Sequence, residues 1–466
     1  MENTLKKDAI GLKETMFQGI ASAAPAGAAV STLTGAAAFA LGSLPLTAFI
    51  GFLVVLLNAL VINRISMKVS GAGGYYEYVK VGYGGRTALF AGLFYIFYQI
   101  MALTLLALSV AVFVPAVLSA GFGINLPSLI WLPLLVVTLL FGFLVSYAGI
   151  RGSTRYTMIM ALLEIIIISI FGVYIVSSHP SINSFSVFTP KYALGGFDGV
   201  GLGVLLMYTA FSGFGASTPL GEESRSPRKA IGKSVIFTAV ILGAFFIFTA
   251  YFFTVAWGPA NMLVYSNSLV PGITIIGSDI GTFAAVIVAV LFINSLLTGS
   301  VVLINGTSRV MMAMGRDGIL PTRTATVHRH RRTPYVAAGL ITSIALVIGI
   351  LGVIILGGFP AFIMAAIAAT LGVLFVHALI NVSLPSIERK FDGKISSTSI
   401  ALSAITVVIF GLIFYSTFLS ISLPVIVGTS MFIAWMMFNF VYVLIAKKKL
   451  IGIKSTETVQ HISADP

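Results

Sequence analysis

Most of this 466-residue chain consists of apolar stretches that are long enough to cross a lipid bilayer. A transmembrane helix needs about 20 consecutive apolar residues, and lipid offers no hydrogen-bond partners to an irregular backbone. The composition agrees, since 58% of the residues are hydrophobic and 9% are charged, against about 25% charged in a typical soluble protein. The sequence therefore predicts an all-α integral membrane protein with little material for a soluble domain.

Hydropathy predicts twelve transmembrane helices. They cover residues 17–41, 44–63, 83–118, 128–148, 156–177, 199–221, 234–257, 281–314, 336–357, 359–382, 397–421 and 423–446. The third and eighth are longer than a perpendicular crossing requires, so we expect them to tilt or to extend beyond the bilayer. Residues 1–16 and 447–466 remain as polar tails.

Basic residues predict the orientation of these helices. Of the 27 Lys and Arg residues, all except Lys191 fall in the two tails or at one side of the twelve-helix arrangement. Lys and Arg concentrate on the cytoplasmic side of membrane proteins, so both termini are expected in the cytoplasm and the protein in the plasma membrane. The net charge of +13 is then a topology signal, and no nucleic-acid partner is expected.

Two of the predicted helices contain runs of small residues with Gly and Pro in their middle. The runs are Ser22, Ala23, Ala24, Pro25, Ala26 and Gly27 in the first helix, and Phe211, Ser212, Gly213, Phe214 and Gly215 in the sixth. In a helix interior Gly costs about 1 kcal/mol and Pro about 3 kcal/mol. We expect both helices to be interrupted, although small residues can also serve only to let helices pack closely.

The two interrupted helices each stand first in a set of five. This placement is typical of inverted repeats with a binding site near the middle of the bilayer, here residues 17–178 and 199–382, followed by two more helices in 397–446. Half-helix N-termini offer N–H groups to a carboxylate, and carbonyls at half-helix C-termini attract an ammonium group. The two runs are therefore the predicted substrate site, and they suit a zwitterion.

Six short motifs follow one another along the chain. They are Gly73-Gly-Tyr-Tyr-Glu-Tyr78, Phe211-Ser-Gly-Phe214, Gly221-Glu-Glu-Ser-Arg-Ser-Pro-Arg-Lys-Ala-Ile231, Ser308-Arg-Val310, Met314-Gly-Arg-Asp-Gly-Ile-Leu-Pro321 and Thr333-Pro334. Their order and spacing resemble the amino acid–polyamine–organocation (APC) superfamily of permeases over about residues 10–445. The resemblance implies two inverted five-helix repeats plus two helices, and alternating access for amino acids or related amines.

The chain departs from that family in three places. The usual Gly-x-Gly break of the first helix is matched by Ala23-Ala-Pro25, and the Glu that many members carry after the Gly-Phe pair of the sixth helix is Gly215. The family's usual Pro before the glycines at Gly73 is missing as well. These changes leave the implied fold intact and weaken the transfer of a particular substrate.

Glu164 is the only acidic residue that falls deep inside the membrane, in the middle of the fifth predicted helix. A carboxyl group there is a functional candidate by default, because a charge in the bilayer costs at least about 3 kcal/mol. In resembling permeases the aligned position often holds Lys beside the break of the first helix. We expect Glu164 to carry a proton or, less favoured, to help coordinate Na⁺, with Thr298 as a further oxygen ligand; a purely structural Glu164 is the alternative.

Four residues are candidate gates. Tyr98 and Tyr208 lie on helices expected to line the substrate path, with simple packing as the alternative. Glu222 and Glu223 follow the sixth helix and are expected to form ion pairs with the basic loops. His377, in the tenth helix, is expected to be a core group rather than a proton relay.

These features predict a secondary active transporter of amino acids and not an enzyme. The chain has no cysteine, no nucleophile–base pair and no metal-binding pattern, and no cofactor is expected besides the driving ion. Because Glu164 is the only acid deep inside, neutral amino acids are the favoured substrates and membrane lipid is the other expected partner. A polyamine or organic-amine carrier, an amino-acid exchanger and a non-transporting amino-acid sensor are the alternatives.

Overall fold

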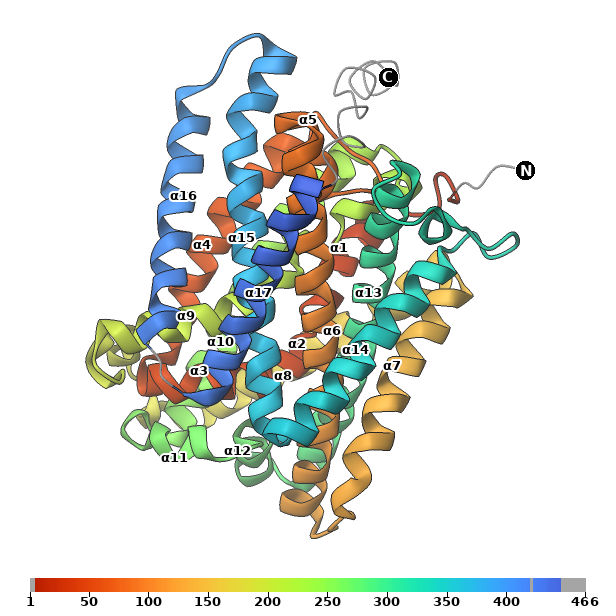
Figure 1. Ribbon diagram of the computed structural model, residues 1–466. Coiled ribbons are helices and arrows are strands. Elements are labelled where there is room, and N and C mark those ends of the chain that lie inside the picture. Colours follow the sequence, from red (N-terminus) through yellow and green to blue (C-terminus); the bar gives the residue numbers. More distant parts are fainter. Residues whose placement is uncertain (1–4, 420–421, 446–466) are drawn as a thin grey trace.

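The computed structural model describes residues 5–419 and 422–445, and within them the chain is a bundle of long helices (Figure 1). The only strand-like pairing in this part of the chain is an isolated bridge between Ile10 and Ser224. The predicted C-terminal tail, 447–466, and residues 1–4 of the N-terminal tail lie outside the described residues.

The first predicted helix is divided into four parts. These are α1 (Leu12–Ser22), α2 (Pro25–Gly27), a π-helical turn (Ala28–Thr32) and α3 (Leu33–Ala40), after which α4 (Leu44–Ser66) begins. The whole stretch of 55 residues counts as one apolar span among eleven in the described chain. A helix of that length would measure about 80 Å against a hydrocarbon layer of about 30 Å. The backbone also turns sharply at Leu41, where φ is 45°, so this span makes two crossings and the total is twelve.

The remaining helices follow the predicted order. They are α5 (Tyr75–Tyr83), α6 (Gly85–Phe122), α7 (Trp131–Ala148), α8 (Ile150–Ser178), α9 (Phe197–Phe211), α10 (Pro227–Trp257), α11 (Met262–Asn267), α12 (Pro271–Asp279), α13 (Thr282–Arg316), α14 (Tyr335–Leu356), α15 (Gly358–Asp392), α16 (Ser397–Ser416) and α17 (Leu423–Ile445). Several run past the predicted ends, because hydropathy marks the apolar part of a helix and not its charged continuation. Thus α10 begins at Pro227 rather than 234, and α15 continues to Asp392 rather than 382.

Three short helices were not predicted. Helix α5 lies near the upper end of the molecule in Figure 1, whereas α11 and α12 lie at the lower end. All three connect long helices, so they cover the ends of the bundle. They are too short or too polar for a search for membrane-spanning segments to find them.

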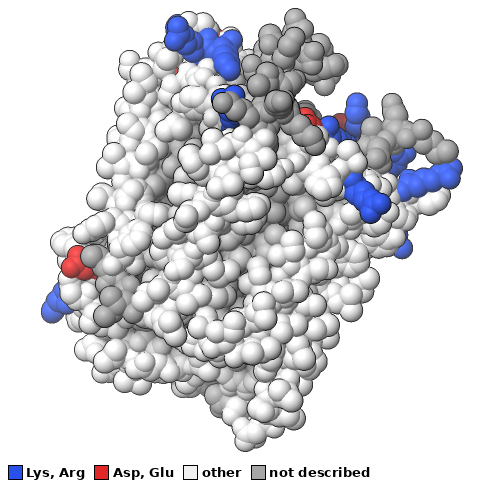
Figure 2. All heavy atoms as spheres, viewed as in Figure 1, with Lys and Arg blue, Asp and Glu red and all other residues white. Residues whose placement is uncertain are grey.

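The bundle has a buried inner set of helices and an outer set that exposes apolar side chains. Helix α6 packs against α13 and α15, and α10 packs against α4 and α1. On the outer helices, Leu140 of α7, Ile354 of α14 and Leu412 of α16 are 49, 68 and 64% exposed. Figure 2 shows most of the visible Lys and Arg near the upper end and the upper right, with a mostly uncharged surface below, apart from one charged cluster at the left edge. Such a broad apolar surface indicates contact with lipid, so the chain is an integral membrane protein.

Candidate functional site

The break in the first helix is a short left-handed kink. Ala24 has φ 46° and ψ 69°, a conformation that costs a non-glycine residue of order 1–3 kcal/mol. Pro25 follows and has no N–H to donate. The N–H of Ala26 donates to Oε2 of Glu164 at 3.2 Å instead of continuing the helix. The sequence Ala23-Ala-Pro25 therefore interrupts the helix where the small-residue run predicted.

The break in the sixth predicted helix is a change from α to 3₁₀ geometry. Helix α9 ends at Phe211, and two 3₁₀ turns, Ser212–Gly215 and Thr218–Glu223, carry the chain to the end of the span. The two breaks touch at Gly213. A Cβ atom there would lie 2.8 Å from the carbonyl oxygen of Gly19 and would collide with the backbone nitrogen of Ala23. Glycine at this position allows the two backbones to meet.

Replacing Gly213 with alanine is expected to push the two breaks apart. Overpacking of this kind costs about 1–3 kcal/mol, and the obstacle is backbone rather than a flexible side chain. We expect a lower thermal midpoint in detergent and a loss of substrate binding by isothermal titration. Gly411→Ala on α16 is the control, because a Cβ at Gly411 meets nothing within 4 Å; equal effects of the two variants would contradict the close approach.

A small cavity lies between the two breaks and α6, with a volume of about 30 Å³. Five predicted substrate residues line it: Ser22, Ala23, Ala24, Gly27 and Ser212. The other predicted residues, Pro25, Ala26, Phe211, Gly213, Phe214 and Gly215, are buried around the breaks but do not line the cavity. None of the described residues in its wall has a charged side chain.

The far wall of the cavity was not predicted from the sequence. Helix α6 contributes Ala102, Leu105, Leu106 and Ser109, and α9 contributes Thr209 and Ala210. Nothing in the local sequence marks Ala102, Leu105 and Leu106, because aliphatic residues fill most of the positions around them in α6. A cavity of this size has room for about two water molecules, whereas small-molecule sites measure about 300–1,000 Å³. The structure is therefore a closed state that must open to admit a substrate.

Glu164 joins three helices at the first break. Its Oε2 atom accepts the N–H of Ala26 and also the hydroxyl of Ser295 on α13 at 2.6 Å. The side chain is fully buried, and its Oε1 atom has no hydrogen-bond partner among the described residues. None of the ion pairs in the described part of the chain includes it. The acid that stands out in the sequence thus contacts the backbone of the predicted substrate site.

Thr298 lies on the same helix as Ser295, but its side chain bonds to the backbone of that helix. Its hydroxyl donates to the carbonyl of Ser295 at 2.9 Å, and the residue is buried. The contact of α13 with Glu164 is therefore made by the hydroxyl of Ser295. Neither residue lines the cavity.

Tyr208 belongs to a buried polar network rather than to the cavity wall. Its hydroxyl shares a hydrogen bond of 2.5 Å with Nδ1 of His377 and accepts from Asn58 at 3.3 Å. Tyr98 packs edge-on against Tyr95, with ring centroids 5.2 Å apart. Both predicted aromatic gates are thus packed into the core beside the site.

The hydroxyl of Tyr75 occupies the space that a side chain at position 215 would need. A Cβ atom on Gly215 would overlap with that hydroxyl. Tyr75 is itself fully buried, and its ring lies edge-on to His377 at 5.3 Å. The absence of Glu at position 215 is therefore matched by a tyrosine from α5 that fills the gap.

Ion pairs join the end of the sixth span to α13 at the basic end of the molecule, which we define as the end that carries α5. Glu223 makes a two-pronged pair with Arg309, and both side chains are at most 1% exposed. Glu222 pairs with Arg316 at 2.9 Å, with each side chain about one third exposed. The partners come from α13 rather than from the loop that follows Glu223. Arg309 also donates to the carbonyl of Asn305 at 2.7 Å.

The N-terminal segment is fastened to the same place. The N–H groups of Ala9 and Ile10 donate to the carbonyl of Glu223 at 2.8 and 3.1 Å, and the N–H of Arg225 donates to the carbonyl of Ile10 at 2.9 Å. With the glutamate ion pairs, these bonds close the basic end of the bundle over the cavity.

A carboxyl group beside this closure titrates in an unusual range. Burial, and next the charge of Glu222, raise the pKa of Glu77 on α5 to about 7. The N–H of Gly73 donates to Glu77 at 3.1 Å. The closed end therefore contains an acid that changes charge near neutral pH.

Residues 14–458 match the family model described as amino acid permease. The chain belongs to the amino acid permease family, within the APC superfamily. Members of this family are membrane transporters, so this permease moves a small molecule across a membrane and is not an enzyme.

Curated relatives cover most of this permease. The branched-chain amino acid permease BcaP of Bacillus subtilis (strain 168) is 25% identical over 79% of this chain and 81% of its own length. The methylthioribose transporter of the same organism is 26% identical over 80 and 79% of the two chains. The low-affinity putrescine importer PlaP of Escherichia coli (strain K12) is 21% identical over 66% of each chain.

A solved structure has the same fold. MhsT, crystallised in complex with L-phenylalanine, aligns with 86% of this permease and 98% of its own chain at a TM-score of 0.60 and 14% identity. That fold contains inverted repeats, so the prediction of two inverted five-helix repeats with interrupted first and sixth helices is confirmed.

Proposed function

We propose that this permease is a secondary active transporter of neutral amino acids that works by alternating access and is driven by protons. The observation that carries the substrate class is the cavity at the two helix breaks, because the described residues of its wall combine interrupted backbone, hydroxyl groups and aliphatic side chains, and none of them is charged. Backbone groups at half-helix ends suit the carboxylate and ammonium of an amino acid. The remaining aliphatic wall suits an uncharged, apolar side chain.

The aliphatic part of the wall comes from Leu105 and Leu106 on α6 and from Leu296 and Leu303 on α13. Each buried CH₂ group of a substrate gains about 0.8 kcal/mol on such a surface. A cationic side chain would lose its hydration without finding a carboxylate on the wall. The relative whose name specifies branched-chain amino acids supports this reading.

Protons are the proposed driving ion because of the position of Glu164. Burial of an unpaired charge costs far more than burial of a neutral carboxyl group, and one oxygen of Glu164 is buried without a partner among the described residues. The same carboxyl group holds the N–H of Ala26 at the first break. A change in its protonation therefore acts directly on the backbone that is proposed to bind substrate.

The basic end is proposed to face the cytoplasm, with both termini on that side and the protein in the plasma membrane. The excess of Lys and Arg at this end supports that orientation. The closed ion pairs of Glu222 and Glu223 then form the cytoplasmic gate, which must separate from α13 before substrate can leave inward.

The experiment that tests the function is uptake of labelled leucine into liposomes that contain the purified protein. A pH gradient, a Na⁺ gradient and no gradient are compared in parallel. We expect accumulation with the pH gradient alone. Na⁺-driven uptake would contradict proton coupling, and flux seen only in exchange for internal amino acid would indicate an exchanger. Uptake of putrescine in place of leucine would favour an organic-amine carrier. The name of the relative PlaP, a putrescine importer, is the reason to test this substrate.

Leu106→Ala is expected to change which neutral amino acids are preferred. The substitution removes about three carbon atoms from the cavity wall, and differences of one methylene are worth about 1–3 kcal/mol in such a pocket. We expect the ratio of phenylalanine to valine uptake to rise at least about tenfold. Leu412→Ala, on the exposed face of α16, is the matched control and leaves the ratio unchanged. An unaltered ratio of phenylalanine to valine uptake in Leu106→Ala would contradict the proposal that Leu106 of α6 contacts the substrate.

A further inference from the structure

A second cavity opens at the basic end, away from the substrate site, and has a volume of about 610 Å³. The N-terminal segment, the corner between α7 and α8, and the loop before α14 form its walls. Six of the side chains that line it are basic: Lys6, Lys7, Arg151, His330, Arg331 and Arg332. Among the described residues no Asp or Glu lines it, and Asp8, the next residue along the N-terminal segment, is not part of its wall.

The floor of this cavity is the start of a long helix. Gly149, with φ 123°, precedes the first turn of α8, and Ile150, Arg151 and Gly152 line the cavity. The first N–H groups of a helix have no intrahelical acceptor and carry partial positive charge. Side-chain cations and these N–H groups thus surround one space, which is the combination that binds phosphate.

We propose that this cavity binds the phosphate of an anionic phospholipid from the leaflet at the basic end. Next to the cavity lie aromatic and basic residues of the kinds found where a membrane protein meets lipid headgroups. The guanidinium of Arg331 lies over the ring of Tyr147 at 4.5 Å, and Tyr147 also contacts the rings of His328 and Tyr335. Tyrosines of this kind concentrate at headgroup level in membrane proteins.

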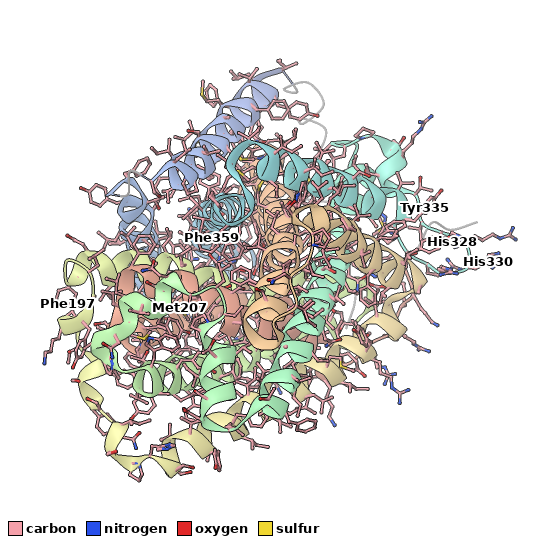
Figure 3. The ribbon with its side chains drawn as sticks, turned by 90° about the horizontal axis from the view of Figure 1, so that it is seen from below. Phe197, Met207, His328, His330, Tyr335 and Phe359 are labelled. Carbon is pink, nitrogen blue, oxygen red and sulfur yellow. The ribbon has the colours of Figure 1, made fainter. Side chains whose placement is uncertain are left out.

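The acyl chains have an apolar surface to follow from these residues. One turn before the end of α7, Leu144 is 51% exposed, and on α14 Leu340 is 44% exposed. Figure 3 shows His328, His330 and Tyr335 together at one edge of the bundle, away from its centre. A lipid can reach an edge of this kind from the bilayer. Its acyl chains would cover the exposed leucines of α7 and α14, whereas a soluble anion would not contact them.

The bound lipid would also contact the closure of the basic end. The Nε atom of Arg151 donates to the carbonyl of Ala9 at 3.3 Å, and Ala9 donates in turn to the carbonyl of Glu223. One wall of the cavity is therefore the same N-terminal segment that is fastened beside the ion pair of Glu223. Occupancy would favour the closed arrangement described above.

The test is native mass spectrometry of the purified full chain with added lipid. Wild-type protein is expected to retain one phosphatidylglycerol, and phosphatidylcholine of the same chain length is expected to dissociate. Two variants, Arg151→Gln with Arg331→Gln and Lys6→Gln with Lys7→Gln, are each expected to bind phosphatidylglycerol about 30-fold more weakly, because each removes two cations near the headgroup. The second variant alters only the N-terminal segment, so the test does not depend on the folding of the first.

The control is Arg389→Gln with Lys394→Gln, which removes the same charge from the exposed end of α15 and the loop after it. We expect its affinity to stay within about threefold of the wild type. Equal loss in this control would overturn the site in favour of general surface charge. Binding of inorganic phosphate that displaces phosphatidylglycerol at millimolar concentration would identify a soluble-anion site and would also overturn the proposal.

Discussion

Replacing Glu164 with glutamine is expected to abolish accumulation driven by a pH gradient while exchange of internal for external amino acid continues. Glutamine keeps the size of the side chain and an oxygen for the N–H of Ala26, but it cannot take up or release a proton. We expect accumulation of labelled leucine in liposomes to fall at least about tenfold. Exchange measured in the same vesicles is expected to stay within about threefold of the wild type.

Ser295→Ala is the control for this prediction. It removes the hydroxyl that donates to Glu164 at 2.6 Å and leaves the ionisable group in place. Its gradient-driven accumulation is expected to persist at a reduced rate. Equal loss of accumulation and exchange in Glu164→Gln would mean that the carboxyl group only supports the helix break, and the proton-coupling proposal would then fail.

Glu223→Gln is expected to destabilise the protein far more than the same change at the neighbouring Glu222. The substitution leaves the guanidinium of Arg309, which is 1% exposed, without a counter-charge. Removing one partner of a buried ion pair costs about 3–5 kcal/mol. We expect a lower thermal midpoint of unfolding in detergent, measured by the fluorescence of the three tryptophans.

The neighbouring residue supplies the matched control. Glu222→Gln makes the same change in charge, but its pair with Arg316 is about one third exposed on each side, and exposed pairs contribute at most about 1 kcal/mol. Adding Arg309→Met to Glu223→Gln removes the isolated charge and is expected to recover most of the lost stability. Equal thermal midpoints for Glu223→Gln and Glu222→Gln would contradict the buried ion pair between Glu223 and Arg309.

Most of the fold could be predicted from the sequence because lipid imposes one requirement on every span. Apolar length located the twelve crossings, and the runs around Pro25 and Gly213 located the two interruptions. Helix ends could not be predicted in the same way, since Arg228 and Lys229 continue α10 beyond the apolar part. The 3₁₀ geometry of Thr218–Glu223 is set by packing against α10 and α13, which no local pattern records.

The site could be predicted only where its residues break a rule of helices. Ala24 and Pro25 interrupt an apolar helix and therefore stand out, whereas Leu106 looks like any lipid-facing leucine. The partner of Glu223 does carry a signal in the sequence. Arg309 lies within the apolar span 281–314, and an arginine in that setting requires a counter-ion. Pairing such residues across the sequence would have joined α13 to the end of the sixth span.

The π-helical turn Ala28–Thr32 places one more residue in the first span than a continuous α-helix would hold. A π turn holds an additional residue compared with an α turn, and each residue of an α-helix corresponds to a rotation of about 100°. Conversion of this turn to α geometry would therefore rotate the segment from Ala23 to Gly27 relative to α3 without breaking the chain elsewhere. Helix α3 can in this way keep its contacts with α9 while the residues at the break present a different face to the cavity.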